Sequence, residues 1–130
     1  MSSTARTEYF ATATFLTALA PTLLGINAIL RPASALSLLK FPAPSQPEGQ
    51  KITYSLMRIY GARTLTMGLT TLIVWARGDR TTLGYLMFAG IPVALVDGFV
   101  SRWQIGGGEW GHWGFIGVSL GLSAGLLGYI

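Results

Sequence analysis

The sequence predicts an all-α integral membrane protein built as a four-helix bundle. Charged residues make up only 11% of the 130-residue chain and hydrophobic residues 51%, whereas about a quarter of the residues in soluble domains are charged. The apolar residues fall into four stretches, over 9–30, 52–76, 81–100 and 112–130. Each has about the 20 residues that a helix needs to cross a bilayer. We expect one transmembrane domain over residues 1–130.

The first span is the clearest, because no residue between Glu8 and Arg31 is charged. A cleaved signal peptide is the alternative, but its apolar region would be unusually long. The following segment is rich in proline, and its stretch 41–50 is predicted to be a loop. Before it, residues 33–39 are apolar enough for a short interfacial helix, which Pro32 can start from the first helical position.

The second and third spans carry ionisable groups. Arg58 and Arg63 lie in the second span and Asp97 lies in the third. Pro92 predicts a kink in the third span, because proline has no N–H to donate to the carbonyl four residues earlier. A polar turn at 77–80 joins the two spans.

The fourth span carries a stripe of small residues. Gly117, Gly121 and Gly125 recur every four residues, with Gly114 and Gly128 beyond them, and such spacing lets another helix approach closely. We expect the stripe to pack inside the bundle; the alternative is a seam between two copies in a homo-oligomer. Because the number of spans is even, both termini are predicted on the same side of the membrane.

Polar residues of all the spans are predicted at one end of the bundle, namely Asn27, Arg58, Asp97 and His112. Arg63 lies deeper, about 18 Å from Lys51 along the helix. An ionisable group in hydrocarbon costs about 2.5 to 3.5 kcal/mol, so we expect Arg58, Arg63 and Asp97 to face the interior. One arginine should bond Asp97 and the other stay free, and Glu109 supplies a second anion if its loop folds inward.

Several classes of function are disfavoured by composition. One histidine and no cysteine do not supply a multi-histidine or thiolate metal centre. We find no nucleotide-binding fingerprint and no haem-ligand set, so we expect neither metal nor cofactor. The net charge of +4 comes from scattered residues, which is unlike a nucleic-acid surface. The expected partners are the lipid bilayer and a hydrophobic small-molecule substrate.

Acid–base chemistry needs a proton donor, a proton acceptor and a positive group for a developing oxyanion. The candidates for proton transfer are Asp97, His112, Glu109 and Tyr60. The candidates for substrate binding are Arg58, Arg63, Asn27, Tyr54, Trp110 and Trp113. Structural roles are the alternatives: an ion pair that fixes helix register for Asp97, interfacial placement for His112 and the tryptophans, and packing for the tyrosines.

Three segments carry a resemblance to a known family: the run 58–69 (RIYGARTLTMGL), Asp97-Gly98 in the third span, and His112-Trp113 at the start of the fourth. They resemble a family of small four-helix membrane proteins, common in fungi and known only as a domain of unknown function. The resemblance covers most of the chain. In that family the residue after the second arginine of the run is often acidic, whereas here it is Thr64.

The resemblance implies a pathway context and assigns no catalytic residue. Members look to be encoded beside fungal secondary-metabolite pathways, where small membrane proteins act as cyclases or isomerases on apolar intermediates. The endoplasmic reticulum or another endomembrane is the expected location. The first hypothesis is a membrane-embedded, cofactor-independent enzyme that isomerises, cyclises or hydrates an apolar small molecule. The alternatives are a non-catalytic subunit or binding protein that assembles with a larger membrane enzyme and, ranked last, a small transporter.

Overall fold

The computed structural model describes residues 1–130 and consists of six α-helices joined by short turns and loops, without strands. The helices are α1 (Ser3–Leu30), α2 (Pro32–Leu38), α3 (Pro47–Ala76), α4 (Arg80–Ala89), α5 (Ile91–Ile105) and α6 (Trp110–Leu126). The predicted all-α class is confirmed. The predicted four-helix bundle is not confirmed, because the third apolar stretch is divided into α4 and α5, whereas α2 corresponds to the short helix predicted over 33–39.

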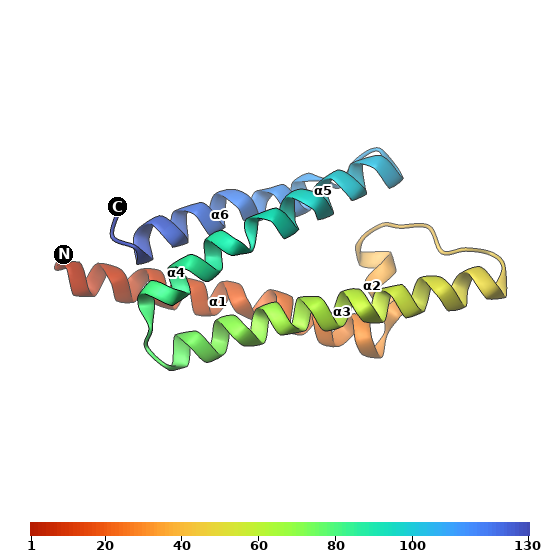
Figure 1. The fold of residues 1–130 in the computed structure, drawn as a ribbon. Helices are drawn as coiled ribbons and strands as arrows, with labels where there is room; N and C mark the ends of the chain where they lie inside the picture. Colours follow the sequence, from red (N-terminus) through yellow and green to blue (C-terminus); the bar gives the residue numbers. More distant parts are fainter.

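The helices form a wedge (Figure 1). α1 and α3 lie side by side in opposite directions, and α6 packs on α4 and α5. The two groups meet where α4 and both termini lie, which we call the closed end, and they diverge toward the open end, where α2 lies (Figure 1). No Cα atom of α5 lies within 8 Å of α1 or α3. Both termini lie at the same end of the molecule (Figure 1), which is compatible with the predicted placement on one side of the membrane.

Small residues bring α1 and α3 into close contact. A Cβ atom added at Gly61 would lie 2.8 Å from both the Cβ of Ala28 and the carbonyl oxygen of Gly25. One added at Gly68 would meet the backbone of Thr22. The interface therefore relies on close approach of two backbones, as in many membrane helix pairs. This seam was not predicted from the sequence.

The glycine stripe of α6 lies elsewhere than expected. Cβ atoms added at Gly114, Gly117 or Gly121 would meet no atom within 4 Å, and Gly125 alone of the helical stripe packs closely, against the ring of Phe10. Gly128, which follows the helix, likewise meets no atom, so the prediction that the stripe packs inside the bundle is wrong for four of its five members. The buried residues of α6 are instead Leu122, Ser123, Gly125 and Leu126, near its C-terminus.

Prolines mark the helix starts. α2 begins at Pro32 as predicted. The predicted loop over 41–50 is wrong in its second half, because Pro47 occupies the first turn of α3, where a missing N–H costs no hydrogen bond. The predicted break in the third span falls at Gly90, two residues before Pro92: the Val93 N–H bonds to the carbonyl of Gly90 at 3.2 Å.

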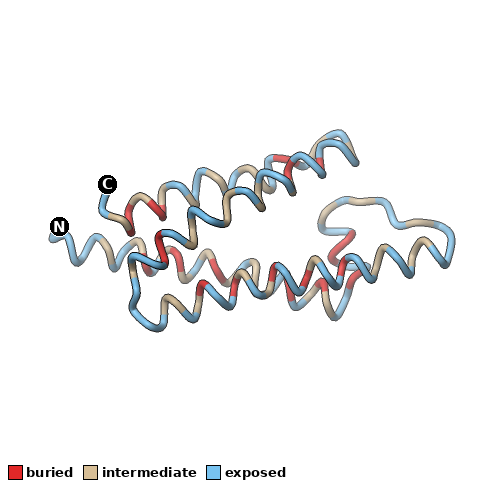
Figure 2. Tube along the Cα trace, viewed as in Figure 1, coloured by how far each residue is buried: buried red, intermediate tan, exposed pale blue.

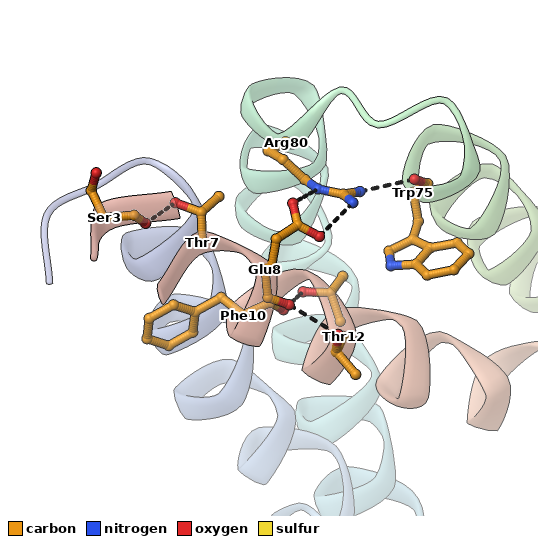
Figure 3. A network of polar contacts seen from close by, with 8 residues as sticks. Ser3, Thr7, Glu8, Phe10, Thr12, Trp75 and Arg80 are labelled. Carbon is orange, nitrogen blue, oxygen red and sulfur yellow. Dashed lines mark hydrogen bonds and ion pairs between the residues drawn. The ribbon is translucent and has the colours of Figure 1, made fainter. Parts of the chain in front are cut away.

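The closed end is fastened by a polar cluster (Figure 3). The Arg80 guanidinium donates through Nε and Nη2 to the two carboxylate oxygens of Glu8, both at 2.9 Å. Its Nη1 donates to the carbonyl oxygen of Trp75 at 2.9 Å. One side chain of α4 thus holds the start of α1 and the end of α3 together.

Many large apolar side chains lie on the molecular surface. Only 22 of 130 residues are buried, and they lie where helices meet (Figure 2). Large apolar side chains such as Leu23, Ile59 and Phe88 are exposed. Two segments, Ser3–Leu30 and Arg80–Ile105, are long and apolar enough to cross a membrane.

Candidate functional site

The wedge encloses a cleft of about 800 Å³, a volume in the usual range for small-molecule sites. Residues of α1 and α3 line one side, residues of α4, α5 and α6 the other, and α2 with its following residues the open end. The exposed lining surface is largely apolar, and its ionisable groups are Lys40, Tyr60, Arg63, Asp97 and His112. The cleft thus brings together four of the predicted site residues.

Helical spacing explains how three helices reach the same cleft. On α3, Tyr60, Arg63 and Met67 lie three and four residues apart and share one face. On α5, Asp97 and Ser101 are four residues apart, and α6 presents His112 with Phe115 and Ser119. Each helix therefore contributes polar groups toward the open end.

An ion pair crosses the cleft from α3 to α5. Nη2 of Arg63 donates to Oδ2 of Asp97 at 2.8 Å and to Oδ1 at 3.1 Å. The side chains are 41% and 19% exposed, respectively. The guanidinium carbon of Arg63 also lies 5.0 Å from the ring centroid of Tyr60, a cation–π contact. Asp97 is thus paired with Arg63, which resolves the choice that the spacing of the two arginines left open.

Arg58 does not join this group. Arg58 is exposed and forms no ion pair, so the prediction that it faces the interior is wrong. Five residues separate it from Arg63, which places it about 140° away around α3. It therefore points away from the face that lines the cleft.

Asn27 and Tyr54 also lie outside the cleft. Nδ2 of Asn27 donates to Oγ of Ser34 at 3.4 Å, which links the end of α1 to α2. Tyr54 packs on the apolar cluster around Met57, beneath α2. Both residues hold α2 against the α1–α3 pair, and neither lines the cleft.

Glu109 folds inward but pairs with a different cation than expected. Its residue is 6% exposed, and Oε1 accepts a hydrogen bond from Nη1 of Arg102 at 2.6 Å, while Oε2 has no partner. The Glu109 carboxyl has a pKa below its usual range, because its own backbone N–H and then Arg102 donate hydrogen bonds to it, against the opposing effect of burial. It does not neutralise an arginine of α3.

The two candidate tryptophans support the helices rather than the cleft. Nε1 of Trp113 donates to the carbonyl oxygen of Leu95 at 3.3 Å, and its ring packs on Gly98, where no Cβ atom would fit. Trp110 is exposed and packs edge-on against Trp113, with ring centroids 5.5 Å apart. These contacts fix α6 on α5 and so set the position of His112.

The cleft therefore holds a carboxylate, a guanidinium, an imidazole and a phenol around an apolar space. A carboxylate or imidazole can accept a proton and an imidazole or phenol can donate one. A guanidinium can stabilise an oxyanion. The set is suited to proton transfer on an apolar molecule that carries an oxygen function.

A family model described as Domain of unknown function (DUF4267) matches residues 18–126. The chain belongs to the DUF4267 family. The match includes Arg63, Asp97 and His112, so the resemblance to a domain of unknown function is confirmed. No curated protein and no solved structure shows significant similarity to this DUF4267 chain.

Sequence reasoning missed one charged residue of the DUF4267 cleft, Lys40. It follows α2 in a segment flanked by proline, where no hydrophobic periodicity indicates the direction of the chain. The threonines and methionines that line the apolar part of the cleft were missed as well, among them Thr17, Thr70, Met67 and Met87. In a chain this apolar, such residues do not stand out from lipid-facing positions.

Proposed function

We propose that this DUF4267 chain is a membrane-embedded, cofactor-independent enzyme that isomerises, cyclises or hydrates an apolar small molecule. The observation that carries the proposal is the cleft, in which the Arg63–Asp97 ion pair and His112 lie beside an apolar space of about 800 Å³. An apolar pocket with a few convergent polar groups is the usual form of a small-molecule site.

The exposed apolar surface supports a membrane location. Ser3–Leu30 and Arg80–Ile105 are each long enough to span the bilayer, and the 30-residue α3 lies beside the first of them. Exposure of the leucine, isoleucine and phenylalanine side chains to water would be unfavourable, and lipid would cover them in a membrane. We place the protein in the endoplasmic reticulum or another endomembrane, within fungal secondary metabolism, as the family resemblance implies.

The proposed reaction is redox-neutral and needs only proton transfer. Asp97 removes a proton from a carbon next to an oxygen function, and the electron pair of the broken C–H bond moves onto the substrate oxygen. Arg63, which uses Nη2 for Asp97, stabilises that oxygen through another N–H. His112 or Tyr60 then donates a proton to a different atom of the substrate as the electron pair moves back from the oxygen, which gives an isomer. Proton exchange from Asp97 to that donor restores both groups. Cyclisation uses the same groups when the deprotonated carbon attacks a carbonyl carbon elsewhere in the substrate. The new C–C bond forms as the C=O π bond breaks, and His112 or Tyr60 protonates the oxygen that receives its electron pair.

The second candidate is a non-catalytic subunit or binding protein that assembles with a larger membrane enzyme. The glycines of α6 that meet no neighbour favour it, because they leave a face that another helix could approach closely. In this case the polar groups of the cleft have a structural role.

The test is conversion by the purified protein in lipid, without added nucleotide or metal. An extract of apolar metabolites from cells that lack this chain serves as the substrate pool. The proposal predicts a compound whose retention time changes at constant mass, or with the gain of one water. Asp97→Asn should lower the rate about 100- to 10,000-fold, whereas Glu48→Gln, on the first turn of α3 outside the cleft, should not. If the folded protein converts no compound, the proposed enzymatic function is contradicted and the role as a non-catalytic subunit is favoured.

A further inference from the structure

Lys40 has an unusual backbone conformation. Its φ of 59° makes it the only residue other than glycine with a positive φ. It follows α2 in a Schellman motif: the Lys40 N–H bonds to the carbonyl of Ser37 at 2.9 Å, and the Phe41 N–H bonds to that of Leu36 at 3.1 Å. Glycine is the preferred residue at this position, because a Cβ atom is strained in the left-handed region.

The Lys40 residue lies between two cavities. It lines the cleft, and it also lines a second pocket formed by α2, the segment after it and Tyr54. It is exposed and forms no ion pair. Because Lys40 pairs with no group of the chain, its strained backbone is not explained by a gain in stability. A ligand that its ammonium group binds explains the conformation more readily.

The charged residues that line the cleft leave a positive excess. Lys40 and Arg63 are the cations, and Asp97 is the one carboxylate. Arg63 bonds Asp97 through Nη2 alone, so Nε and Nη1 remain free for an incoming group. The apolar remainder of the cleft offers no second anion.

We propose that Lys40 and Arg63 recognise the anionic head of the cleft's ligand, which is a carboxylate attached to an apolar body. One excess positive charge matches one carboxylate, and guanidinium and ammonium groups form charge-assisted hydrogen bonds with it. The apolar body occupies the space beside Met67 and Met87. The inference rests on the proposed function, because it names the substrate class of the same cleft.

The test measures binding separately from conversion. The fluorescent polyene fatty acid parinaric acid, its alcohol and its amine are titrated against the protein in nanodiscs of neutral phosphatidylcholine. We expect the acid to bind about tenfold more tightly than the alcohol and the amine to bind least, because one charge-assisted bond is worth about that factor. Lys40→Gln should remove most of this preference, whereas Lys51→Gln, an exposed lysine outside the cleft, should keep it.

Lys40→Gly separates recognition from folding. It relieves the backbone strain, so the melting temperature should rise while the preference for the acid is lost. A lower melting temperature would contradict the strain argument. Equal binding of the acid and the alcohol would overturn the proposal that the ligand is anionic. A Lys40→Gln variant that keeps the full preference for the acid would overturn it as well. If conversion persists in either case, the proposed enzymatic function still stands. Displacement of parinaric acid by an anionic phospholipid in the nanodisc would overturn the assignment to a free carboxylate.

Discussion

Substitution of Gly61 by alanine tests the packing that shapes the wedge. The new Cβ would lie 2.8 Å from both the Ala28 Cβ and the Gly25 carbonyl oxygen, and 2.9 Å from the backbone nitrogen of Ile29. Two of these three neighbours are backbone atoms, which cannot rotate away as a flexible side chain can. α1 and α3 must therefore separate by several tenths of an ångström along their shared seam.

The expected loss of stability follows from two opposing contributions. Overpacking of a well-packed interface costs about 1 to 3 kcal/mol, and a rigid backbone neighbour favours the upper part of that range. Alanine gains about 1 kcal/mol over glycine in helix propensity. We expect Gly61→Ala to lower the free energy of unfolding by about 2 kcal/mol.

Gly117→Ala is the matched control, because a Cβ there meets no atom within 4 Å. It should stabilise the protein by up to about 1 kcal/mol through helix propensity alone. The measurement is reversible unfolding of both variants by denaturant in mixed micelles. If Gly61→Ala is as stable as Gly117→Ala, α1 and α3 do not approach each other as closely as these distances indicate.

Three further perturbations address other parts of the wedge. Pro92→Ala restores a backbone N–H donor at the break between α4 and α5. We expect normal expression and weaker binding of parinaric acid. Unchanged binding would show that the break does not shape the ligand site. The pKa of Glu109 is lowered from 4.5, first by a hydrogen bond from its own backbone N–H and then by Arg102. The stability that these contacts supply is present above the unfolded pKa and is lost as pH falls through the folded pKa. Below about pH 4.5 the melting temperature should therefore fall less steeply with pH in Glu109→Gln than in the unchanged protein. Arg80→Gln removes both bonds to Glu8 and should lower the melting temperature more at low than at high salt, whereas a salt-independent loss would contradict an electrostatic origin.

The helices were largely predictable because apolar stretches and prolines act locally. Pro32 indicated the start of α2, whereas Pro47 was misread as loop, since proline is equally at home in a loop and in the first turn of a helix. The division at Gly90 was predicted only approximately, because the missing N–H of Pro92 disturbs the helix before the proline itself.

The site was less predictable because spacing gives a helix face but not its neighbour. The glycine stripe of α6 is regular, but its members Gly114 and Gly117 face no helix of the chain. The spacing of the two arginines of α3 does not say which of them pairs with Asp97, and only the wedge geometry selects Arg63. The Glu8–Arg80 pair joins residues 72 positions apart, a separation that no local pattern indicates.

The most direct test of the central claim is conversion and thermal stability of Asp97→Asn, measured on one preparation. Asparagine is nearly isosteric and its amide oxygen can still accept from Arg63, which is 41% exposed and so keeps access to other partners. We therefore predict a folded protein whose conversion is about 100- to 10,000-fold slower. Arg63→Lys should retain part of the conversion, because a positive charge remains beside the cleft. A folded, stable Asp97→Asn protein with full conversion would contradict the account and leave His112 and Tyr60 as the groups that transfer protons in the cleft.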